Sequence, residues 1–157
     1  MGKIKFLVMD VDGTLTDGKI YISGQGEIMK AFDIKDGYTI YTLDKIGIIP
    51  IIITGRSSDI VARRAEELKI KEIYQGVSNK LQKLNEVLAK YGGDLSEVAY
   101  IGDDYNDLDC IHACGLSACP ADAEEDIMHE VDYVCKKNAG NGALRDFVKK
   151  IQELNKC

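Results

Sequence analysis

The sequence lacks the features of several common protein classes. It has no basic excess, because 20 Lys and Arg residues stand against 26 Asp and Glu residues for a formal net charge of -6, and nucleic-acid binders normally carry a basic surface. It contains no apolar run near the ~20 residues of a membrane-spanning helix, and the apolar run Phe6–Met9 is too short for a signal peptide. We therefore expect a cytoplasmic protein with no nucleic-acid and no membrane partner.

The cysteines also lack a metal-binding pattern. Their number is odd, and no pair has the two-residue spacing of a zinc knuckle. We expect reduced, mostly buried thiols at these positions, which are Cys110, Cys114, Cys119, Cys135 and Cys157.

No repeat, low-complexity tract or linker divides the chain, and 157 residues suit one domain. Within this predicted single domain, residues 1–157, short apolar runs of β-forming residues alternate with segments of helical period. The apolar runs are continuous, so we expect both faces of each strand to be covered. The predicted strands are Phe6–Met9, Ile48–Ile53, Glu72–Tyr74, Val98–Ile101, Leu116–Cys119 and Tyr133–Cys135.

Amphipathic helices are predicted between these strands. Ser57 or Ser58 can cap a helix over Asp59–Leu68. Strands that alternate with helices predict an α/β fold with a doubly wound, Rossmann-like parallel sheet, whose ligands bind at the carboxyl ends of the strands. Two further helices show apolar stripes, one with Leu81, Leu84, Val87 and Leu88 and one with Leu144, Phe147, Val148, Ile151 and Leu154.

The segment Lys19–Phe32 breaks this alternation. It has a Gly-rich stretch, Gly24-Gln25-Gly26, between two β-forming runs. This pattern is typical of a β-hairpin. We therefore predict a small hairpin insertion over about residues 19–32.

Acidic and small polar residues follow the ends of several predicted strands. Asp10 and Asp12 come at the end of the first strand, and residues two apart on an extended chain point the same way. Thr54-Gly55 ends the second strand, Lys80 opens a helix, and Asp103 follows the fourth strand. Each of these alone is explained by a turn, a helix cap or a surface lysine. Their joint placement at strand ends favours a functional site.

These residue types have one coherent chemical use. Carboxylates suit Mg²⁺, which offsets phosphate charge and lets an anionic nucleophile approach phosphorus. Asp10 would attack to form an aspartyl-phosphate, and Asp12 would protonate the leaving alkoxide and later deprotonate water. Thr54, Gly55 and Lys80 would bind the phosphate. The sequence thus predicts a magnesium-dependent phosphatase.

The pattern resembles the haloacid dehalogenase-like phosphohydrolase superfamily. The resemblance implies that Asp10, the main-chain carbonyl of Asp12 and Asp103 bind Mg²⁺. It also implies that Asp104 and Asp107 support the site from outside the ligands of the metal. The residues that match the superfamily's four motifs are Asp10-Val11-Asp12-Gly13-Thr14, Thr54, Lys80 and Gly102-Asp103-Asp104.

Most members of that superfamily carry a cap domain, for which the chain has no room before Thr54 or between Lys80 and Asp103. It resembles the capless 3-deoxy-D-manno-octulosonate 8-phosphate phosphatases, and is also similar to the nine-carbon, sialic-type 9-phosphate phosphatases. The resemblance implies a homotetramer whose subunits associate through their hairpins. The resembling segments are Asp17-Gly18 with the hairpin, Phe32 through Asp36-Gly37, Thr54-Gly55-Arg56, Arg63-Arg64-Ala65, Gly76-Val77 and residues 138–146.

A sugar-acid phosphate carries a carboxylate besides its phosphate, and this second anion needs a cation beside the site. Arg56 is the first candidate, because it follows the phosphate-binding turn and a guanidinium can bind a carboxylate bidentately. Arg64 is the second candidate. Arg56 resembles the octulosonate branch, whereas the nine-carbon branch can carry an acid at this position, so the first substrate is favoured and the second remains open.

Two interpretations from other classes are weighed against the phosphatase. A phosphoacceptor receiver domain also places Asp, Thr and Lys at strand ends, but its first acidic group is an adjacent pair and its acceptor lies on a later strand. The second interpretation is a non-catalytic oligomerisation domain, because relatives occur fused to cytidylyltransferases. The complete set of Asp, Thr and Lys residues favours an active enzyme.

Overall fold

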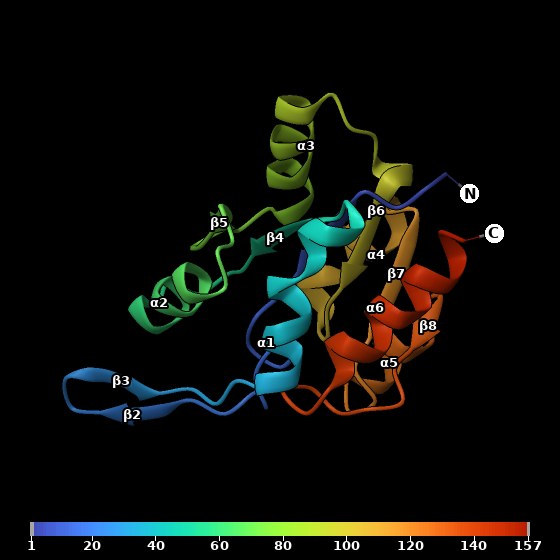
Figure 1. Ribbon diagram of the computed structural model, residues 1–157. Helices are drawn as coiled ribbons and strands as arrows, with labels where there is room; N and C mark the ends of the chain where they lie inside the picture. Colours follow the sequence, from blue (N-terminus) through green and yellow to red (C-terminus); the bar gives the residue numbers. More distant parts are fainter. Residues whose placement is uncertain (1, 157) are drawn as a thin grey trace.

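The computed structural model describes residues 2–156, and within them six strands form one sheet in the order β5-β4-β1-β6-β7-β8 (Figure 1). Every pair of neighbouring strands is parallel. β1 therefore lies in the middle of the sheet with β4 and β6 beside it. The strands are β1 (Phe6–Met9), β4 (Ile49–Ile53), β5 (Glu72–Tyr74), β6 (Val98–Ile101), β7 (Leu116–Cys119) and β8 (Tyr133–Val134).

The strand order identifies the type of doubly wound sheet. Counted along the chain without the two hairpin strands, the order reads 3-2-1-4-5-6, which is the Rossmann-like order with its switch point between β1 and β6. The predicted Rossmann-like sheet is confirmed. A receiver domain would instead show the flavodoxin-like order 2-1-3-4-5, so that alternative is wrong.

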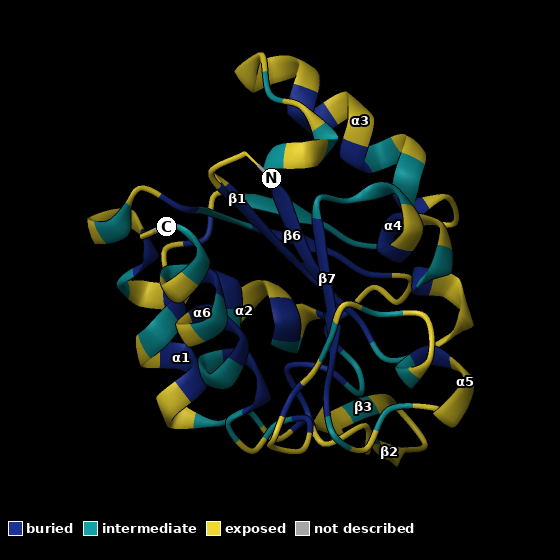
Figure 2. Cartoon of the chain, turned by 90° about the vertical axis from the view of Figure 1, so that its right-hand side faces the viewer, coloured by how far each residue is buried: buried dark blue, intermediate teal, exposed yellow. Residues whose placement is uncertain are grey.

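Helices cover both faces of the sheet because side chains on each strand alternate between two apolar clusters. Leu7 and Met9 pack on one side with α1, α2 and α6, and Phe6 and Val8 on the other with α3, α4 and α5. Figure 2 shows the buried central strands between these layers. The helices are α1 (Ile34–Tyr41), α2 (Asp59–Glu67), α3 (Lys80–Tyr91), α4 (Leu108–Ala113), α5 (Glu125–Met128) and α6 (Ala143–Leu154), with 3-10 turns at Leu43–Ile46, Leu95–Glu97 and Tyr105–Asp107.

The observed boundaries differ little from the predicted ones. β4 begins one residue later than predicted, at Ile49, and β8 ends one residue earlier, at Val134. Ser58 is the residue that caps α2, because its side chain accepts a hydrogen bond from the Val61 N–H. The short helices α4 and α5 lie in stretches for which no helix was predicted.

The predicted hairpin is present between β1 and α1, where the structure contains no cap domain in the described residues. Its strands β2 (Tyr21–Ser23) and β3 (Gly26–Met29) pair antiparallel, and it projects away from the body (Figure 1). An isolated bridge between Thr16 and Phe32 closes its root. The exposed apolar side chains of the hairpin are Tyr21, Ile22, Ile28 and Met29.

The structure also bears on the expected lack of membrane-spanning helices and on the state of the cysteines. Among residues 2–156, no helix is long and apolar enough to cross a membrane. The four described cysteines have free thiols, with Cys110, Cys119 and Cys135 buried and Cys114 half-buried. The prediction that most of the thiols are buried is confirmed for these four, and Cys157 lies outside the described residues.

Candidate active site

Acidic residues and one lysine meet at the carboxyl ends of β1 and β6. The Lys80 ammonium donates to Asp10 Oδ1 at 2.9 Å and to Asp107 Oδ1 at 2.7 Å. Lys80 is the first residue of α3, whose start is fixed by the side chain of Asn79 as N-cap. The Lys80 side chain is only 2% exposed, so burial and two carboxylates hold its charge in one place. We refer to Asp10, Lys80, Tyr100, Asp103 and Asp107 as the inner cluster.

Asp107 is the anchor of the inner cluster. Its Oδ1 accepts from the Tyr100 hydroxyl at 2.5 Å as well as from Lys80. Its Oδ2 accepts the backbone N–H groups of Asp103 at 3.0 Å and Asp104 at 3.3 Å. Both oxygens are therefore occupied, and Asp107 fixes Lys80 and the loop after β6 rather than offering a free ligand atom.

The donor set suits a divalent cation. One oxygen from each of Asp10, Asp103 and Asp107 lies within 4.8 Å of the others. Burial and the neighbouring Asp107 raise the pKa of Asp10 in spite of Lys80. Burial and the charge of Asp10 raise the pKa of Asp103 to about 8. Because both oxygens of Asp107 already accept hydrogen bonds, Asp10 and Asp103 supply the carboxylate donors of this group. Hard, negatively charged oxygen donors fit Mg²⁺.

The turn after β1 brings the chain close to this cluster. Thr14 Oγ1 donates to Asp103 Oδ1 at 2.8 Å. Gly13 has a φ of +84°, and a Cβ atom there would lie 2.2 Å from Asp103 Oδ2. Only glycine allows this approach, because any larger residue would displace the Asp103 carboxylate.

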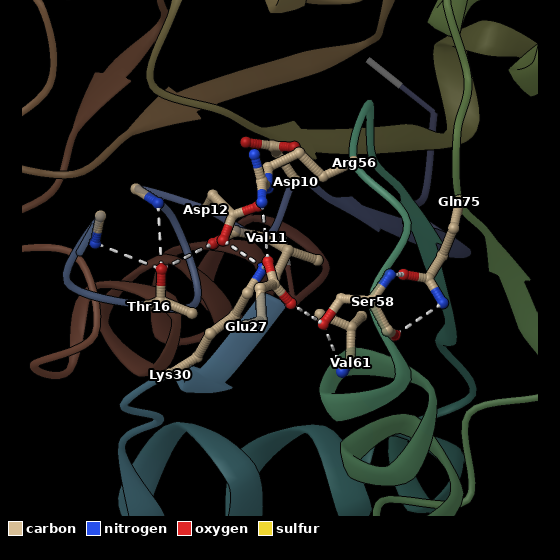
Figure 3. Close-up of polar contacts among 12 residues, drawn as sticks. Asp10, Val11, Asp12, Thr16, Glu27, Lys30, Arg56, Ser58, Val61 and Gln75 are labelled. Carbon is tan, nitrogen blue, oxygen red and sulfur yellow. Dashed lines mark hydrogen bonds and ion pairs between the residues drawn. The ribbon is translucent and has the colours of Figure 1, made fainter. Parts of the chain in front are cut away.

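A second group of charges lies beside the first, and Figure 3 shows it. The Lys30 ammonium is 2.7 Å from Asp12 Oδ1 and 3.2 Å from Glu27 Oε1. Glu27 also accepts from Arg56 at 2.9 Å and from the Ser58 hydroxyl at 2.6 Å. We refer to Asp12, Glu27, Lys30, Arg56 and Ser58 as the outer cluster. Burial opposes the charge of Glu27, yet hydrogen bonds from Ser58, Arg56 and Lys30 lower its pKa to about 2.

Asp10 and Asp12 are held by different cations. β1 ends at Met9, and the chain then turns, with the Val11 carbonyl accepting the N–H groups of residues 14–16. Asp12 therefore lies in a turn rather than on the extended strand that the sequence argument assumed. Its carboxylate contacts Lys30, whereas that of Asp10 contacts Lys80.

Thr54 and Gly55 follow β4 at the same edge of the sheet. The Thr54 N–H donates to the Tyr74 carbonyl at 3.0 Å, and the Thr54 carbonyl accepts from the Val77 N–H at 3.1 Å. Thr54 is buried, and Gly55 begins the exposed turn that leads to Arg56. The phosphate-binding turn predicted from sequence is thus a backbone-fixed connection between β4 and α2.

Arg64 is not brought to either cluster. Its guanidinium lies 5.5 Å above the Phe32 ring and pairs with Glu67 at 3.4 Å. It also donates to the Asp33 carbonyl at 3.5 Å, and a Cβ atom on Gly37 would lie 2.3 Å from its Nη2. The structure therefore separates the two predicted substrate arginines, because Arg56 joins the outer cluster and Arg64 packs between α1 and α2.

Asp104 is also used locally. Its side chain accepts from the Tyr105 N–H at 2.7 Å and so caps the 3-10 turn that carries Asp107. This contact holds Asp107 in place through the backbone, from a position outside the inner cluster.

Sequence reasoning missed four residues of these clusters, one of which, Ser58, was predicted only as a helix cap. In the sequence, Tyr100 looks like an ordinary core residue of the apolar strand Val98–Ile101, and no motif indicates that its hydroxyl has a polar partner. Glu27 and Lys30 lie in the predicted hairpin, where the only signal is a pair of opposite charges three residues apart in an otherwise apolar strand.

Comparison with known protein families first identifies the general class of enzyme to which the chain belongs. The family model of the haloacid dehalogenase-like hydrolases matches residues 65–146. This agrees with the Rossmann-like sheet and with carboxylates at the ends of β1 and β6.

Individual relatives identify the family within this class of hydrolases. The chain is 42% identical over 143 residues to the 3-deoxy-D-manno-octulosonate 8-phosphate phosphatase of Yersinia pestis, covering 91% of this chain and 76% of the relative. A structure of the enzyme of that name from Moraxella catarrhalis, solved with magnesium, phosphate and KDO, superposes with a TM-score of 0.93 at 42% identity, covering 98% of this chain and 88% of the other. The chain belongs to this phosphatase family of the haloacid dehalogenase-like hydrolases.

Proposed function

We propose that this protein is a magnesium-dependent phosphatase that hydrolyses 3-deoxy-D-manno-octulosonate 8-phosphate to the free sugar acid and phosphate. The observation that carries the proposal is the buried contact of Lys80 with Asp10, beside Asp103, in a chain of this family. The relatives support the substrate, because one is named for it and another was solved with KDO, the sugar-acid product, beside magnesium and phosphate. We take residues 1–157 to act as one phosphatase domain.

In this proposal Asp10, the main-chain carbonyl of Asp12, and Asp103 hold the metal. Bound Mg²⁺ offsets the negative charge of the substrate's phosphate and of the carboxylates. Asp107 remains outside the ligands because its two oxygens already accept hydrogen bonds. Asp104 supports Asp107 through the turn that it caps.

The reaction proceeds in two steps through this chain's own residues. Asp10 Oδ1 accepts from Lys80, which leaves Oδ2 to attack phosphorus while the bond to the sugar oxygen breaks and Asp12 gives that oxygen a proton. Asp12 then takes a proton from a water that hydrolyses the aspartyl-phosphate. Thr54, Gly55 and Lys80 bind the non-bridging oxygens throughout.

Arg56 is the residue that we assign to the carboxylate of the sugar acid. Its side chain is half exposed, so it can meet a ligand while Glu27 holds one side of the guanidinium. The contacts of Arg64 with Phe32 and Glu67 make it the weaker candidate. A nine-carbon acid phosphate carries a carboxylate too, so the eight-carbon substrate is favoured by the relatives and by the resemblance of Arg56 to the octulosonate branch. The nine-carbon acid phosphate serves as a competitor in the test below.

A homotetramer and a cytoplasmic location are parts of the same proposal. The hairpin exposes Ile22 at 66% and Ile28 at 62%, and an isolated two-stranded hairpin is marginal in water. Burial of these side chains against other subunits would remove that liability. The free thiols suit a reducing compartment.

The test is a phosphate-release screen with Mg²⁺ over phosphorylated sugar acids, nine-carbon acid phosphates and neutral sugar phosphates. We expect the octulosonate phosphate to give the highest catalytic efficiency. Chelation should stop turnover, Mg²⁺ should restore it, and Ca²⁺ should restore it poorly because its coordination is larger and looser. Full activity in chelator would remove the metal from the mechanism, and preference for a nine-carbon acid would change the substrate.

A further inference from the structure

Lys30 is a buried lysine that the proposed mechanism does not use. It comes directly after β3, at the root of the hairpin, and its side chain is 0% exposed. Lysine is almost never fully buried unless paired, since taking a charge out of water costs several kcal/mol. Lys30 pairs with Asp12 Oδ1 at 2.7 Å and with Glu27 Oε1 at 3.2 Å. Its ammonium is therefore held at one point between the hairpin and the turn after β1.

Asp12 needs a partner of this kind. It lies beyond the end of β1 and its side chain is 20% exposed, so strand packing does not fix the direction of its carboxylate. Lys30 occupies Oδ1, whereas Oδ2 has the Arg56 Nε at 4.0 Å, beyond hydrogen-bond length. One carboxylate oxygen is thus fixed and the other is left for proton exchange.

Glu27 places the lysine. Its carboxylate accepts from Lys30, Arg56 and the Ser58 hydroxyl, and Ser58 is itself fixed as the N-cap of α2. The line of contacts from α2 through Glu27 to Lys30 ends at Asp12. The root of the hairpin is therefore joined to the carboxylate that exchanges protons.

We propose that Lys30 is the positioning residue for Asp12, holding its carboxylate in the direction from which it protonates the leaving sugar oxygen. The inference rests on the proposed function. In the first step the phosphorus–oxygen bond to the sugar breaks, the phosphoryl group goes to Asp10 and the proton of Asp12 goes to the sugar oxygen. A well-stabilised leaving group such as nitrophenolate needs no proton, so the role of Lys30 depends on the leaving group.

The experiment compares Lys30→Met with the unchanged protein on two substrates, the octulosonate phosphate and p-nitrophenyl phosphate. Rapid mixing isolates the first step, because Asp12 acts again in the second. General acid catalysis contributes roughly 10²–10⁴-fold, so misplacing the acid should slow the first step with the sugar phosphate about ten- to a hundredfold. Release of nitrophenolate in the first turnover should fall less than about threefold. Lys19→Met, at the exposed opposite root of the hairpin, is the control and should leave both rates unchanged.

Equal losses on both substrates, or no loss on either, would overturn the positioning role and leave Lys30 as a support of the fold. If Lys30→Met has no cooperative thermal transition, Lys30→Gln replaces it in the same comparison, since glutamine is polar but lacks the charge and is one bond too short to take the place of the ammonium at Asp12. If the unchanged protein does not hydrolyse the octulosonate phosphate, the proposed substrate fails. Any primary alkyl phosphate that it does hydrolyse then serves for Lys30.

Discussion

The inner and outer clusters lie side by side, yet they are built in different ways. The inner cluster comes from the ends of β1 and β6 and the start of α3, and its central contacts are those of buried Lys80. The outer cluster draws on a turn, the hairpin and the exposed stretch before α2, and Arg56 in it is half exposed. We therefore propose a division of labour, in which the inner cluster holds the nucleophile and the metal, while the outer cluster directs the general acid Asp12 and binds the carboxylate of the substrate.

The largest effect should come from the inner cluster. Asp10→Asn keeps the shape of the side chain but removes the proposed nucleophile, so turnover should be abolished on every phosphate ester. The fold should persist, because burial and Asp107 already disfavour a charge at this position. Turnover and circular dichroism on the same sample check this. Substantial activity in the folded variant would contradict the role of Asp10 and the division of labour with it.

A smaller and selective effect is expected from the outer cluster. Arg56→Ala should lose roughly 1.5–3 kcal/mol of a charge-assisted contact, which corresponds to about a ten- to a hundredfold loss of catalytic efficiency on a sugar-acid phosphate. A neutral sugar phosphate should lose little. Arg64→Ala is the matched control, and from its contacts with Phe32 and Glu67 we expect a smaller loss. Equal losses of Arg56→Ala on both substrates would assign Arg56 to the phosphate or to the fold.

The hairpin allows a test of whether the outer cluster depends on assembly. Ile28→Asp places a charge on an exposed apolar strand without touching the contacts of Glu27 or Lys30. We expect light scattering to show a smaller species than for the unchanged protein, with lower activity on the sugar-acid phosphate. A monomer in both proteins at micromolar concentration, with full activity, would rule out the tetramer.

The smallest effect is in the pH dependence of stability. The ionised carboxylate of Glu27 in the outer cluster should stabilise the folded protein, whereas that of Asp103 in the inner cluster should destabilise it. Glu27 has its pKa lowered to about 2 from 4.5, so its stabilisation is complete above pH 4.5 and is lost as the pH falls toward 2. Asp103 has its pKa raised to about 8 from 3.8, so its charged form destabilises the metal-free protein. This destabilisation is complete above pH 8 and disappears as the pH falls toward 4, where the carboxyl group of the folded protein is protonated.

Thermal unfolding without metal checks both signs. Glu27→Gln should lower the melting temperature at pH 6 and have less effect at pH 3. Asp103→Asn should raise it at pH 9 and have less effect at pH 5. If the melting temperature changed in the same direction for Glu27→Gln at pH 6 and Asp103→Asn at pH 9, the two clusters would not be electrostatically distinct.

Much of the fold and inner cluster followed from the sequence, and the reason is physical. Continuous apolar runs in a parallel sheet end where acids begin, so the bounds of β1 and β6 and the positions of Asp10 and Asp103 were readable directly. The type of Rossmann-like sheet needed strand order, which the structure supplied.

The outer cluster was not predictable in the same way. The contact of Lys30 with Asp12 depends on how the hairpin root folds back on a turn, and no periodicity encodes that geometry. Arg64 shows the converse, because it lies in the resembling segment Arg63-Arg64-Ala65 and was predicted as the second cation for the substrate's carboxylate. The packing of α2 instead directs it over Phe32 and beside Gly37.

The central place of β1 also has a consequence for how the protein folds. Phe6 pairs with Ile49 on one side and with Val98 on the other, so both neighbours of the first strand are distant in sequence. Such long-range parallel pairing is slow, since loop-closure entropy is lost before the contacts form. The proposed metal ligands Asp10 and Asp103 meet only once β1 and β6 are side by side, so the complete site forms late in folding. Magnesium that binds there stabilises the folded state by mass action.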